Sequence, residues 1–293
     1  MKEFVIRELE KEQWKRTPMP LAYKPKTEKT EGKNMIQEQL VTLSLTYPER
    51  GERPVRVFVP EHEEGETLPV IYMTDGQNLF DKESSGFGCW YTREAVREER
   101  AASGKAAIIV GVHNVDPWRE NELMPKSIGA IVCPEEVRPR IDPQGEIFDE
   151  FVIHTLIPVV EARFPVKTGR ENRAFCGSSM GGLMSFFTVL RHAELYSAAG
   201  VLSPAFLLYS EADMRRWLEE TMGEYKPFLY LYTGAEGELE AEICRSLAWT
   251  YAILKECYPD AQLKYVVKPE QIHHEIAWEP IFRDFLHLFL TQK

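Results

Sequence analysis

The stretch RAFCGSSMGGL, Arg173–Leu183, determines both the kind of fold and the kind of chemistry that this chain can support. A short apolar run leads into Gly-x-Ser-x-Gly, and a helical pattern begins near Met180. A strand–turn–helix of this form holds the serine at its centre, here Ser179, in a strained backbone conformation with an exposed hydroxyl. The flanking glycines leave room for the sharp turn. The stretch predicts a nucleophilic serine, with a glycine-rich helix start without chemistry as the alternative.

Apolar runs on both sides of this stretch predict the sheet to which it belongs. They end in polar loops, and they lie at 68–76, 106–114, 173–177, 197–204, 228–234 and 263–269. Strands that are apolar throughout are buried on both faces, so helices must cover both sides of a parallel sheet. Helical patterns lie between them, as at 146–164, where Pro158 predicts a kink or a restart.

Two alternating segments, Gln39–Leu45 and Arg53–Pro60, precede these runs and predict an antiparallel hairpin. The order of elements therefore predicts an α/β fold with a mostly parallel, doubly wound sheet and an N-terminal antiparallel hairpin. Residues 1–35 are highly charged and contain prolines, and they read as an N-terminal extension to which the sequence assigns no role. Residues 36–293 are expected to form the catalytic domain.

Composition narrows the possible partners and the compartment. The net charge is −11, with basic residues interleaved among acids, so no basic patch for a nucleic acid is expected. No apolar run approaches the roughly 20 residues of a membrane helix, and the first residues lack the apolar core of a signal peptide. A cytoplasmic protein is therefore expected. Five cysteines without paired or metal-like spacing predict free thiols and no metal site.

A serine nucleophile needs a general base, and in this architecture the acid and then the histidine follow the serine along the chain. His192 ends the serine's own helix, and His287 lies inside a C-terminal helical pattern. His273 and His274, after the last apolar strand, are the remaining candidates. Adjacent residues point in opposite directions, so only one of the two can serve as the base.

The acid of such a triad is expected after the preceding strand, in the sequence TGAEGELE. Glu236 lies nearest the strand end and ranks first, followed by Glu238, with Glu240 also open. The alternative for each of them is a solvated acidic loop.

The oxyanion of an acyl transfer needs two N–H donors. The backbone of Met180, directly after the nucleophile, is one candidate, and Gly76 or Gln77 in the loop after an earlier strand is the other. The alternative for Asp75-Gly76 is a plain turn.

Further segments occur in a fixed order along the chain: VIYMTDGQNLFD, CW at 89–90, IVGVHN followed by RENELMP, FVIHTLIPVVEARF, CGSSMGGLMSFF, VLSPAF and HHEIAW. With these segments the chain strongly resembles the putative esterase family of α/β-hydrolases over roughly residues 40–290. That family includes feruloyl and acetyl-xylan esterases, siderophore trilactone esterases and S-formylglutathione hydrolase. The resemblance implies the α/β-hydrolase fold and Ser179 as the nucleophile.

The same resemblance assigns further residues. The family's His-x-Glu-x-x-Trp pattern maps onto His273, Glu275 and Trp278, which makes His273 the base. The loop TGAEGE departs by one residue from the family's loop before the acid, so the choice among the three glutamates stays open.

The substrate pocket is also expected from the resemblance. Arg119 and Glu122 match a recurring Arg-x-x-Glu near the family's site, and Trp90 and the SPAF loop, Ser203–Phe206, are expected to line the pocket. Ordinary core packing is the alternative for the two aromatic residues.

The resulting expectation is a serine esterase that acts through an acyl-enzyme on a small or sugar-linked ester of acetyl, feruloyl or lactone type. No cofactor, metal, nucleic acid or membrane is expected, and the partner is a small-molecule ester bound by a monomer or homodimer. The alternatives are an acyltransferase on the same fold and a binding protein without activity.

Overall fold

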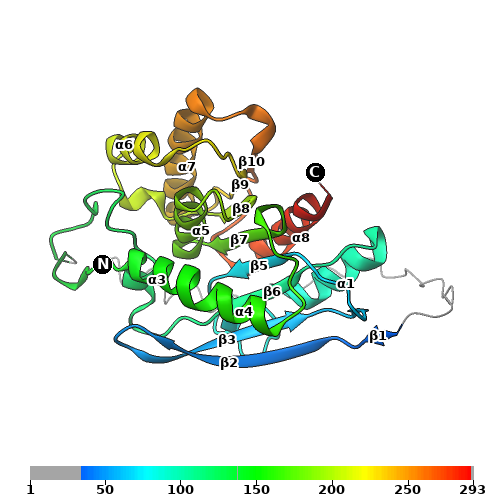
Figure 1. Ribbon diagram of the computed structural model, residues 1–293. Helices are drawn as coiled ribbons and strands as arrows, with labels where there is room; N and C mark the ends of the chain where they lie inside the picture. Colours follow the sequence, from blue (N-terminus) through cyan, green and yellow to red (C-terminus); the bar gives the residue numbers. More distant parts are fainter. Residues whose placement is uncertain (1–33, 137, 292–293) are drawn as a thin grey trace. The chain divides into compact units, whose positions relative to one another are not determined.

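A mixed sheet of eight strands organises the fold in the order β10-β9-β8-β7-β5-β6-β3-β2 (Figure 1). The computed structural model describes residues 34–136 and 138–291. The strands are β2 (Gln39–Tyr47), β3 (Gly51–Val59), β5 (Val70–Met73), β6 (Ile108–Val112), β7 (Arg173–Ser178), β8 (Ala198–Leu202), β9 (Phe228–Thr233) and β10 (Leu263–Val267). Every strand from β5 to β10 pairs in parallel with its neighbours from that set.

The N-terminal hairpin forms the antiparallel edge of this sheet. β2 and β3 pair along their whole length, from Gln39 opposite Val59 to Tyr47 opposite Gly51, and β3 continues antiparallel to β6. β1 (Met35–Ile36) pairs with β4 (His62–Glu63) in a separate two-stranded sheet. Residues 1–33 of the predicted extension 1–35 lie outside the described residues, so the domain boundary at 35 stays a prediction.

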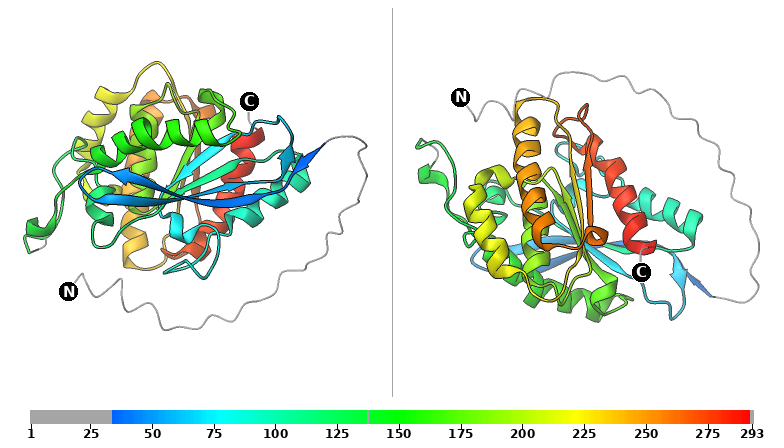
Figure 2. Two further views of the ribbon diagram at one scale, coloured as in Figure 1. Left: turned by 60° about the horizontal axis from the view of Figure 1, so that its bottom comes forward. Right: turned by 90° about the horizontal axis from the view of Figure 1, so that it is seen from above.

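Helices cover both faces of the sheet, as Figure 2 shows. One face packs on α1 (Thr92–Ser103) and α8 (Glu275–Thr291), and the other on α3 (Gly145–Phe151), α4 (Ile157–Arg163), α5 (Met180–Arg191), α6 (Glu211–Thr221) and α7 (Glu238–Cys257). The remaining short elements are α2 (Arg119–Glu122), η2 (Gly76–Asn78), η3 (Arg138–Arg140), η5 (Arg170–Asn172), η6 (Phe206–Leu208) and η7 (Asp260–Gln262). Each face carries its own cluster of buried apolar side chains. The doubly wound α/β fold is confirmed.

Pro158 follows a change of winding in the helical segment between β6 and β7, where the sequence predicts a kink or a restart, but the helix continues without a break. α3 passes into a π-helical turn, η4 (Val152–Leu156), and α4 begins directly afterwards with Pro158 in its first turn. The backbone stays helical through this region, since the Ile157 N–H donates to the Val152 carbonyl, and the change to π-helical winding accommodates a residue that lacks an N–H.

The C-terminal helix begins earlier than its sequence pattern indicates. The pattern suggests a helix from Glu279, whereas α8 begins at Glu275 and contains Pro280. The ring Nδ1 of His274 accepts the Ile276 N–H at 3.2 Å, which satisfies one of the free donors of the first turn. The histidine pair therefore lies directly before a helix N-terminus.

The strand order locates the crevice of the sheet. After β5 the chain moves to β6 on one side, and it later returns to β7 on the other side. Ligands of open α/β sheets bind at such a reversal, beyond the carboxyl ends of the strands. Met73 at the end of β5 is level with Cys176 of β7, so the loops that follow these two strands leave the sheet side by side.

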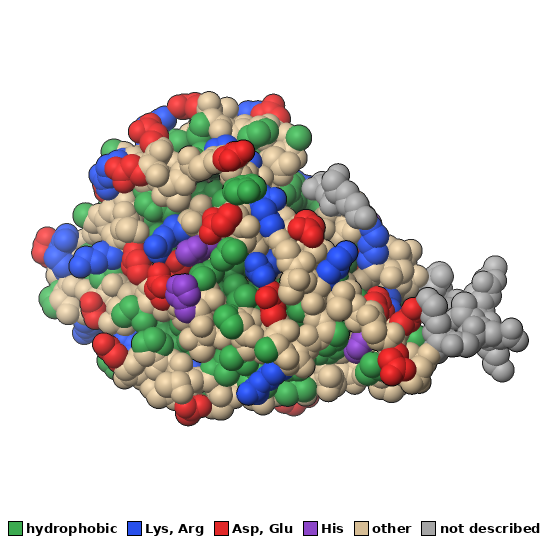
Figure 3. All heavy atoms as spheres, in the orientation of Figure 1, with side chains coloured by type: hydrophobic (Ala, Val, Ile, Leu, Met, Phe, Trp, Pro, Cys, Tyr) green, Lys and Arg blue, Asp and Glu red, His purple; other side chains and the backbone are tan. Residues whose placement is uncertain are grey.

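The distribution of charge, the hydropathy of the helices and the cysteines complete the description. Acidic and basic side chains lie interleaved over the face shown in Figure 3. Within the described ranges, no helix is long and apolar enough to span a bilayer. All five cysteines are free thiols, as their spacing predicts.

Candidate active site

Ser179 occupies the sharp turn between β7 and α5. Its backbone has φ 58° and ψ −123°, in the region that costs a non-glycine residue strain. The Ser179 N–H donates to the Leu202 carbonyl at 2.9 Å, and its side chain stays partly exposed. The turn requires its glycines, because a Cβ on Gly177 would lie 2.6 Å from the Gly181 carbonyl oxygen.

His273 is the histidine that contacts a carboxylate at this end of the sheet. Its Nδ1 lies 2.6 Å from Oε2 of Glu240, and its ring meets the Trp278 ring edge-on with centroids 4.9 Å apart. These two contacts fix the position of the ring. With Nδ1 bonded to a carboxylate, Nε2 is the atom left to exchange a proton with a nucleophile.

The structure corrects the order of the three acid candidates. Glu236, ranked first, is exposed, and its backbone N–H donates to Gln271 O at 3.0 Å. Glu238, the first residue of α7, is exposed as well. Glu240 is 1% exposed and bonds His273. The physical reason is that α7 starts two residues after Glu236, and of the two glutamates in its first turn only Glu240 faces the sheet.

Glu240 is held as an anion by four donors. Besides His273, its carboxylate accepts the hydroxyls of Ser203 at 2.5 Å and Thr233 at 3.2 Å and the Gly234 N–H at 2.8 Å. Burial alone would raise the pKa of Glu240, but the bonds from His273, Ser203 and Gly234 outweigh it and lower the pKa. The N-terminus of α7 adds a favourable dipole.

His274 has a different role from its neighbour. Its Nδ1 accepts the Ile276 N–H, and burial together with the nearby His273 lowers its pKa. The two side chains thus serve different partners, as expected of adjacent residues.

The expected oxyanion donors lie on the two loops that leave β5 and β7. Met180 is the first residue of α5, where backbone N–H groups have no intrahelical acceptor. Gly76 and Gln77 open the short helix η2, after Asp75 with φ 54°. Gly76 is needed for a reason that the sequence does not reveal, because a Cβ there would lie 2.4 Å from the carbonyl oxygen of Gly111 on β6.

An ion pair anchors the loop after β5. Arg119 donates through Nε and Nη2 to the two oxygens of Asp75 at 2.6 and 2.8 Å, and Asn114 Nδ2 donates to the same carboxylate at 2.6 Å. Burial alone would raise the pKa of Asp75, but Arg119 and Asn114 outweigh it and lower the pKa. Arg119 therefore holds the loop that carries Gly76 and Gln77.

A family model described as "Putative esterase" matches residues 49–226, which is more than half of the chain. The chain belongs to this esterase family. Membership supports ester hydrolysis as its activity. The uncharacterized protein YbbA of Bacillus subtilis (strain 168) is 19% identical over 245 residues, which cover 79% of this chain and 90% of that protein.

Solved structures of esterases share the fold. A ferulic acid esterase aligns with a TM-score of 0.60 at 16% identity, covering 87% of this chain and 98% of its own. The siderophore hydrolase EstA from Aspergillus nidulans aligns with a TM-score of 0.64 at 16% identity, covering 84% and 92%. These likenesses show that this esterase-family chain has the α/β-hydrolase fold.

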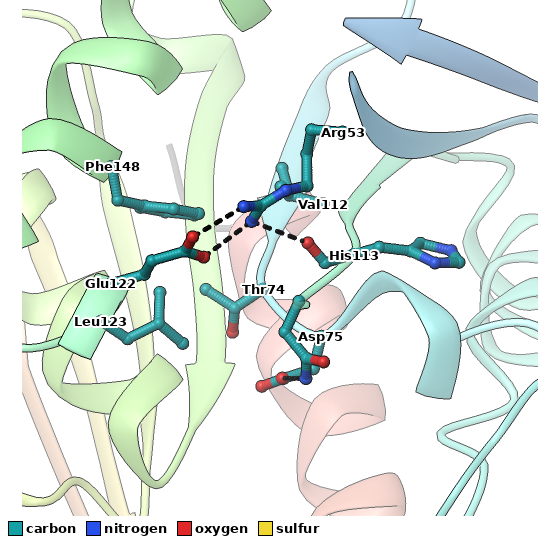
Figure 4. Close-up of a pocket in the computed structure, with 9 residues that line it drawn as sticks. Arg53, Thr74, Asp75, Val112, His113, Glu122, Leu123 and Phe148 are labelled. Atoms are coloured by element: carbon teal, nitrogen blue, oxygen red, sulfur yellow. Dashed lines mark hydrogen bonds and ion pairs between the residues drawn. The ribbon is translucent and has the colours of Figure 1, made fainter. Parts of the chain in front are cut away.

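Glu122, expected in the substrate pocket of this esterase-family chain, is paired within the protein instead. Both of its oxygens accept from Arg53 at 2.8 Å, and Arg50 donates to one of them at 2.6 Å. Figure 4 shows Arg53 reaching from its strand to Glu122, beside a small pocket that Thr74 and Asp75 also line. With 1% exposure and two arginines, Glu122 joins α2 to the hairpin and has no free oxygen for a ligand.

Trp90 and Phe206 follow the core-packing alternative. Trp90 is 3% exposed and contacts Trp278 and Phe282 with centroids 6.1 Å away in each case. Phe206 is fully buried, with its centroid 4.8 Å from that of Phe186. Both residues follow strands at the expected end of the sheet, but their rings turn inward because apolar neighbours lie beneath them.

Ser203, expected by resemblance in the pocket-lining loop Ser203–Phe206, is buried and belongs to the cluster around Glu240 instead. Ser203 has φ 40° at the end of β8, donates to Glu240 and accepts the indole N–H of Trp278 at 2.9 Å. Its position directly after an apolar strand, in the sequence VLSPAF, is the signal that places it at this end of the sheet.

Proposed function

We propose that the protein is a serine carboxylic-ester hydrolase that works through an acyl-enzyme. The observation that carries the proposal is the 2.6 Å contact between His273 Nδ1 and the buried Glu240, formed at the same end of the sheet as the strained turn of Ser179. A buried carboxylate that orients a histidine at the carboxyl ends of parallel strands fits the acid–base pair of a serine hydrolase.

In this proposal the hydroxyl oxygen of Ser179 attacks the ester carbonyl, and His273 Nε2 takes the serine proton. Glu240 keeps the ring in the required tautomer and stabilises the imidazolium that forms. The N–H groups of Met180 and of Gly76 or Gln77 bind the oxyanion. His273 then protonates the leaving alcohol, and as a base it activates the water that releases the acid from Ser179.

The substrate is proposed to be a small or sugar-linked ester of acetyl, feruloyl or lactone type. Apolar side chains beside the histidine favour a substrate with an apolar group: Phe87 is 62% exposed, and Ile276 is 60% exposed. The segment carrying Phe87 packs on the start of α8, since a Cβ on Gly88 would lie 2.9 Å from Glu275 Cβ. Exposed apolar side chains on segments next to a site are candidates for contact with a substrate.

A panel of acetyl, butyryl, feruloyl and lactone esters tests both parts of the proposal. If the wild type hydrolyses any of these esters and Ser179→Ala does not, the esterase proposal is supported. If kcat/KM is higher for the feruloyl ester than for the others and falls in Phe87→Ser, the apolar surface is supported. Absence of hydrolysis across the panel, or acyl transfer to an added alcohol in preference to water, contradicts a hydrolase.

A further inference from the structure

The proposed mechanism gives no role to a buried carboxyl group that directly follows the two histidines. Glu275 is the first residue of α8, directly after His273 and His274, and it is 7% exposed. Buried carboxyl groups are rare unless they are paired, and Glu275 has no cation within a salt bridge distance among those that the structure describes, apart from a 3.9 Å approach to His274 Nδ1. Its side chain therefore needs another explanation.

The hydrogen-bond partner of Glu275 lies on the loop of the expected oxyanion donors. Asn78 Nδ2 donates to Glu275 Oε1 at 3.2 Å, across 197 residues of sequence. Asn78 is the last residue of η2, next to Gln77, and its own N–H closes that short helix by donating to Asp75 O at 2.8 Å. The contact joins the segment of the proposed base to the segment of the proposed oxyanion donors.

Asn78 also fixes the loop that packs over this junction. Its carbonyl accepts the Trp90 N–H at 2.9 Å, and its Oδ1 accepts the Gly86 N–H at 3.3 Å. A side chain with both its amide ends bonded has one orientation available, so loss of Glu275 would free the Nδ2 end inside the protein.

We infer that Glu275 is a positioning residue, which sets the oxyanion loop against the catalytic histidine through its hydrogen bond with Asn78. The inference rests on the proposed esterase function. Glu275 would act through the position of the N–H donors, because a donor displaced by even 1 Å stabilises the transition state much less.

The charge of Glu275 is compatible with this role. Burial, with the Asp75 carboxylate adding to it, raises the pKa of Glu275 to about 7, while its own backbone N–H, Arg119 and Asn78 act in the opposite direction. The charged or titratable groups around it are Asp75 after β5, Arg119 on α2 and His274 before α8. A carboxyl that is neutral over much of the range below neutral pH does not repel a developing oxyanion.

The test compares kcat and KM for p-nitrophenyl acetate in Glu275→Ala, Asn78→Ala, the double variant and Glu275→Gln. The control is Glu279→Gln, one turn along α8, where the carboxylate meets Arg283 at the surface. We expect each alanine variant to lower kcat about 10- to 100-fold and to change KM by less than about threefold. The kcat of the double variant should lie within about threefold of the kcat of each single variant, because both changes break the same contact. Glu275→Gln is expected to stay within about fivefold, because its amide oxygen can still accept from Asn78.

Unchanged kcat in Glu275→Ala, multiplying effects in the double variant, or a glutamine variant as impaired as the alanine one would overturn the inference. If Glu275→Ala does not fold, as judged by circular dichroism, the comparison of Asn78→Ala with Glu275→Gln decides in the same way. Labelling of the wild type by a fluorophosphonate separates the two proposals. A wild type that does not label contradicts the esterase itself, whereas a labelled wild type with unaffected variants contradicts only the role of Glu275.

Discussion

At the scale of single residues, the site depends on which carboxylate reaches His273. Glu240 does so because it lies on the side of the first turn of α7 that faces the sheet, buried among Ser203, Thr233 and Gly234. Glu236 is four residues closer to the strand along the chain but faces solvent. Distance along the sequence is thus a poor guide to the acid, since the start of the following helix decides which side chain turns inward.

Replacement of this acid tests the assignment. We expect Glu240→Gln to lower kcat by about 10³- to 10⁴-fold, because the amide no longer holds the charged imidazolium in the transition state. Glu236→Gln, in the exposed loop, is the matched control and should stay within about twofold. Steady-state kinetics with p-nitrophenyl acetate measures both, and an equal loss in the two variants would count against Glu240.

The two histidines allow a second comparison at this scale. His273→Ala is expected to lose about 10⁴-fold or more in kcat, because Ser179 then has no base. His274→Ala removes an acceptor at the start of α8 and should cost about 1 kcal/mol of stability with little change in kcat. Kinetics and urea unfolding of both variants separate these effects, and an inactive, stable His274→Ala would reverse the assignment.

The sequence proposes Ser179 as nucleophile from a local signal, the glycine-flanked turn. The position after the last strand leaves His273 and His274, and the family resemblance favours His273. It does not predict the contacts of Ser203 with Glu240 and Trp278 or the contact between Asn78 and Glu275. Each of those depends on two or more segments that only the fold brings together.

At the scale of elements, Ser203 joins the end of β8 to two helices. Its hydroxyl donates to Glu240 of α7 and accepts the indole N–H of Trp278 of α8, and its backbone N–H donates to the Tyr232 carbonyl of β9 at 2.7 Å. The buried Ser203 hydroxyl therefore connects Glu240 with Trp278, whose ring packs against His273.

Removal of that hydroxyl leaves a buried donor and a buried carboxylate each short of a partner. We expect Ser203→Ala to lower the free energy of unfolding by about 1–3 kcal/mol. Trp278→Phe removes the indole donor, so the loss in the double variant should be smaller than the sum of the two single losses. Urea unfolding of the three variants measures this, and additive losses would mean that the two side chains act separately.

Element boundaries show where sequence patterns stop being informative. The hairpin and the parallel strands follow from alternation and continuous apolar runs. The early start of α8 does not, since it depends on the contact between His274 and the Ile276 N–H. Trp90 and Phe206 lie at the expected end of the sheet, but the direction of a ring is set by its neighbours rather than by its position in the chain.

At the scale of the whole molecule, buried carboxyl groups make stability depend on pH in opposite directions. Glu240 and Asp75 have lowered pKa values, so their contribution is present above their ordinary pKa and is lost as pH falls. Glu275 has its pKa raised from 4.5 to about 7, so its contribution is present below about pH 4.5 and is lost as pH rises through about 7.

A comparison of Glu275→Gln with the wild type isolates the second effect. The glutamine cannot ionise, so the free energy of unfolding of the variant, relative to the wild type, should increase by about 3 kcal/mol between about pH 4.5 and about pH 8. Urea unfolding at several pH values measures the difference, with Glu279→Gln as the control. A difference that is constant with pH would show that Glu275 titrates normally.

Fluorophosphonate labelling followed by peptide mass spectrometry tests the serine mechanism most directly. The proposed chemistry predicts one adduct, on the peptide that contains Ser179, with labelling abolished in Ser179→Ala and strongly slowed in His273→Ala. An adduct on another residue, equal labelling of Ser179→Ala, or no labelling of a wild type that hydrolyses esters would contradict it.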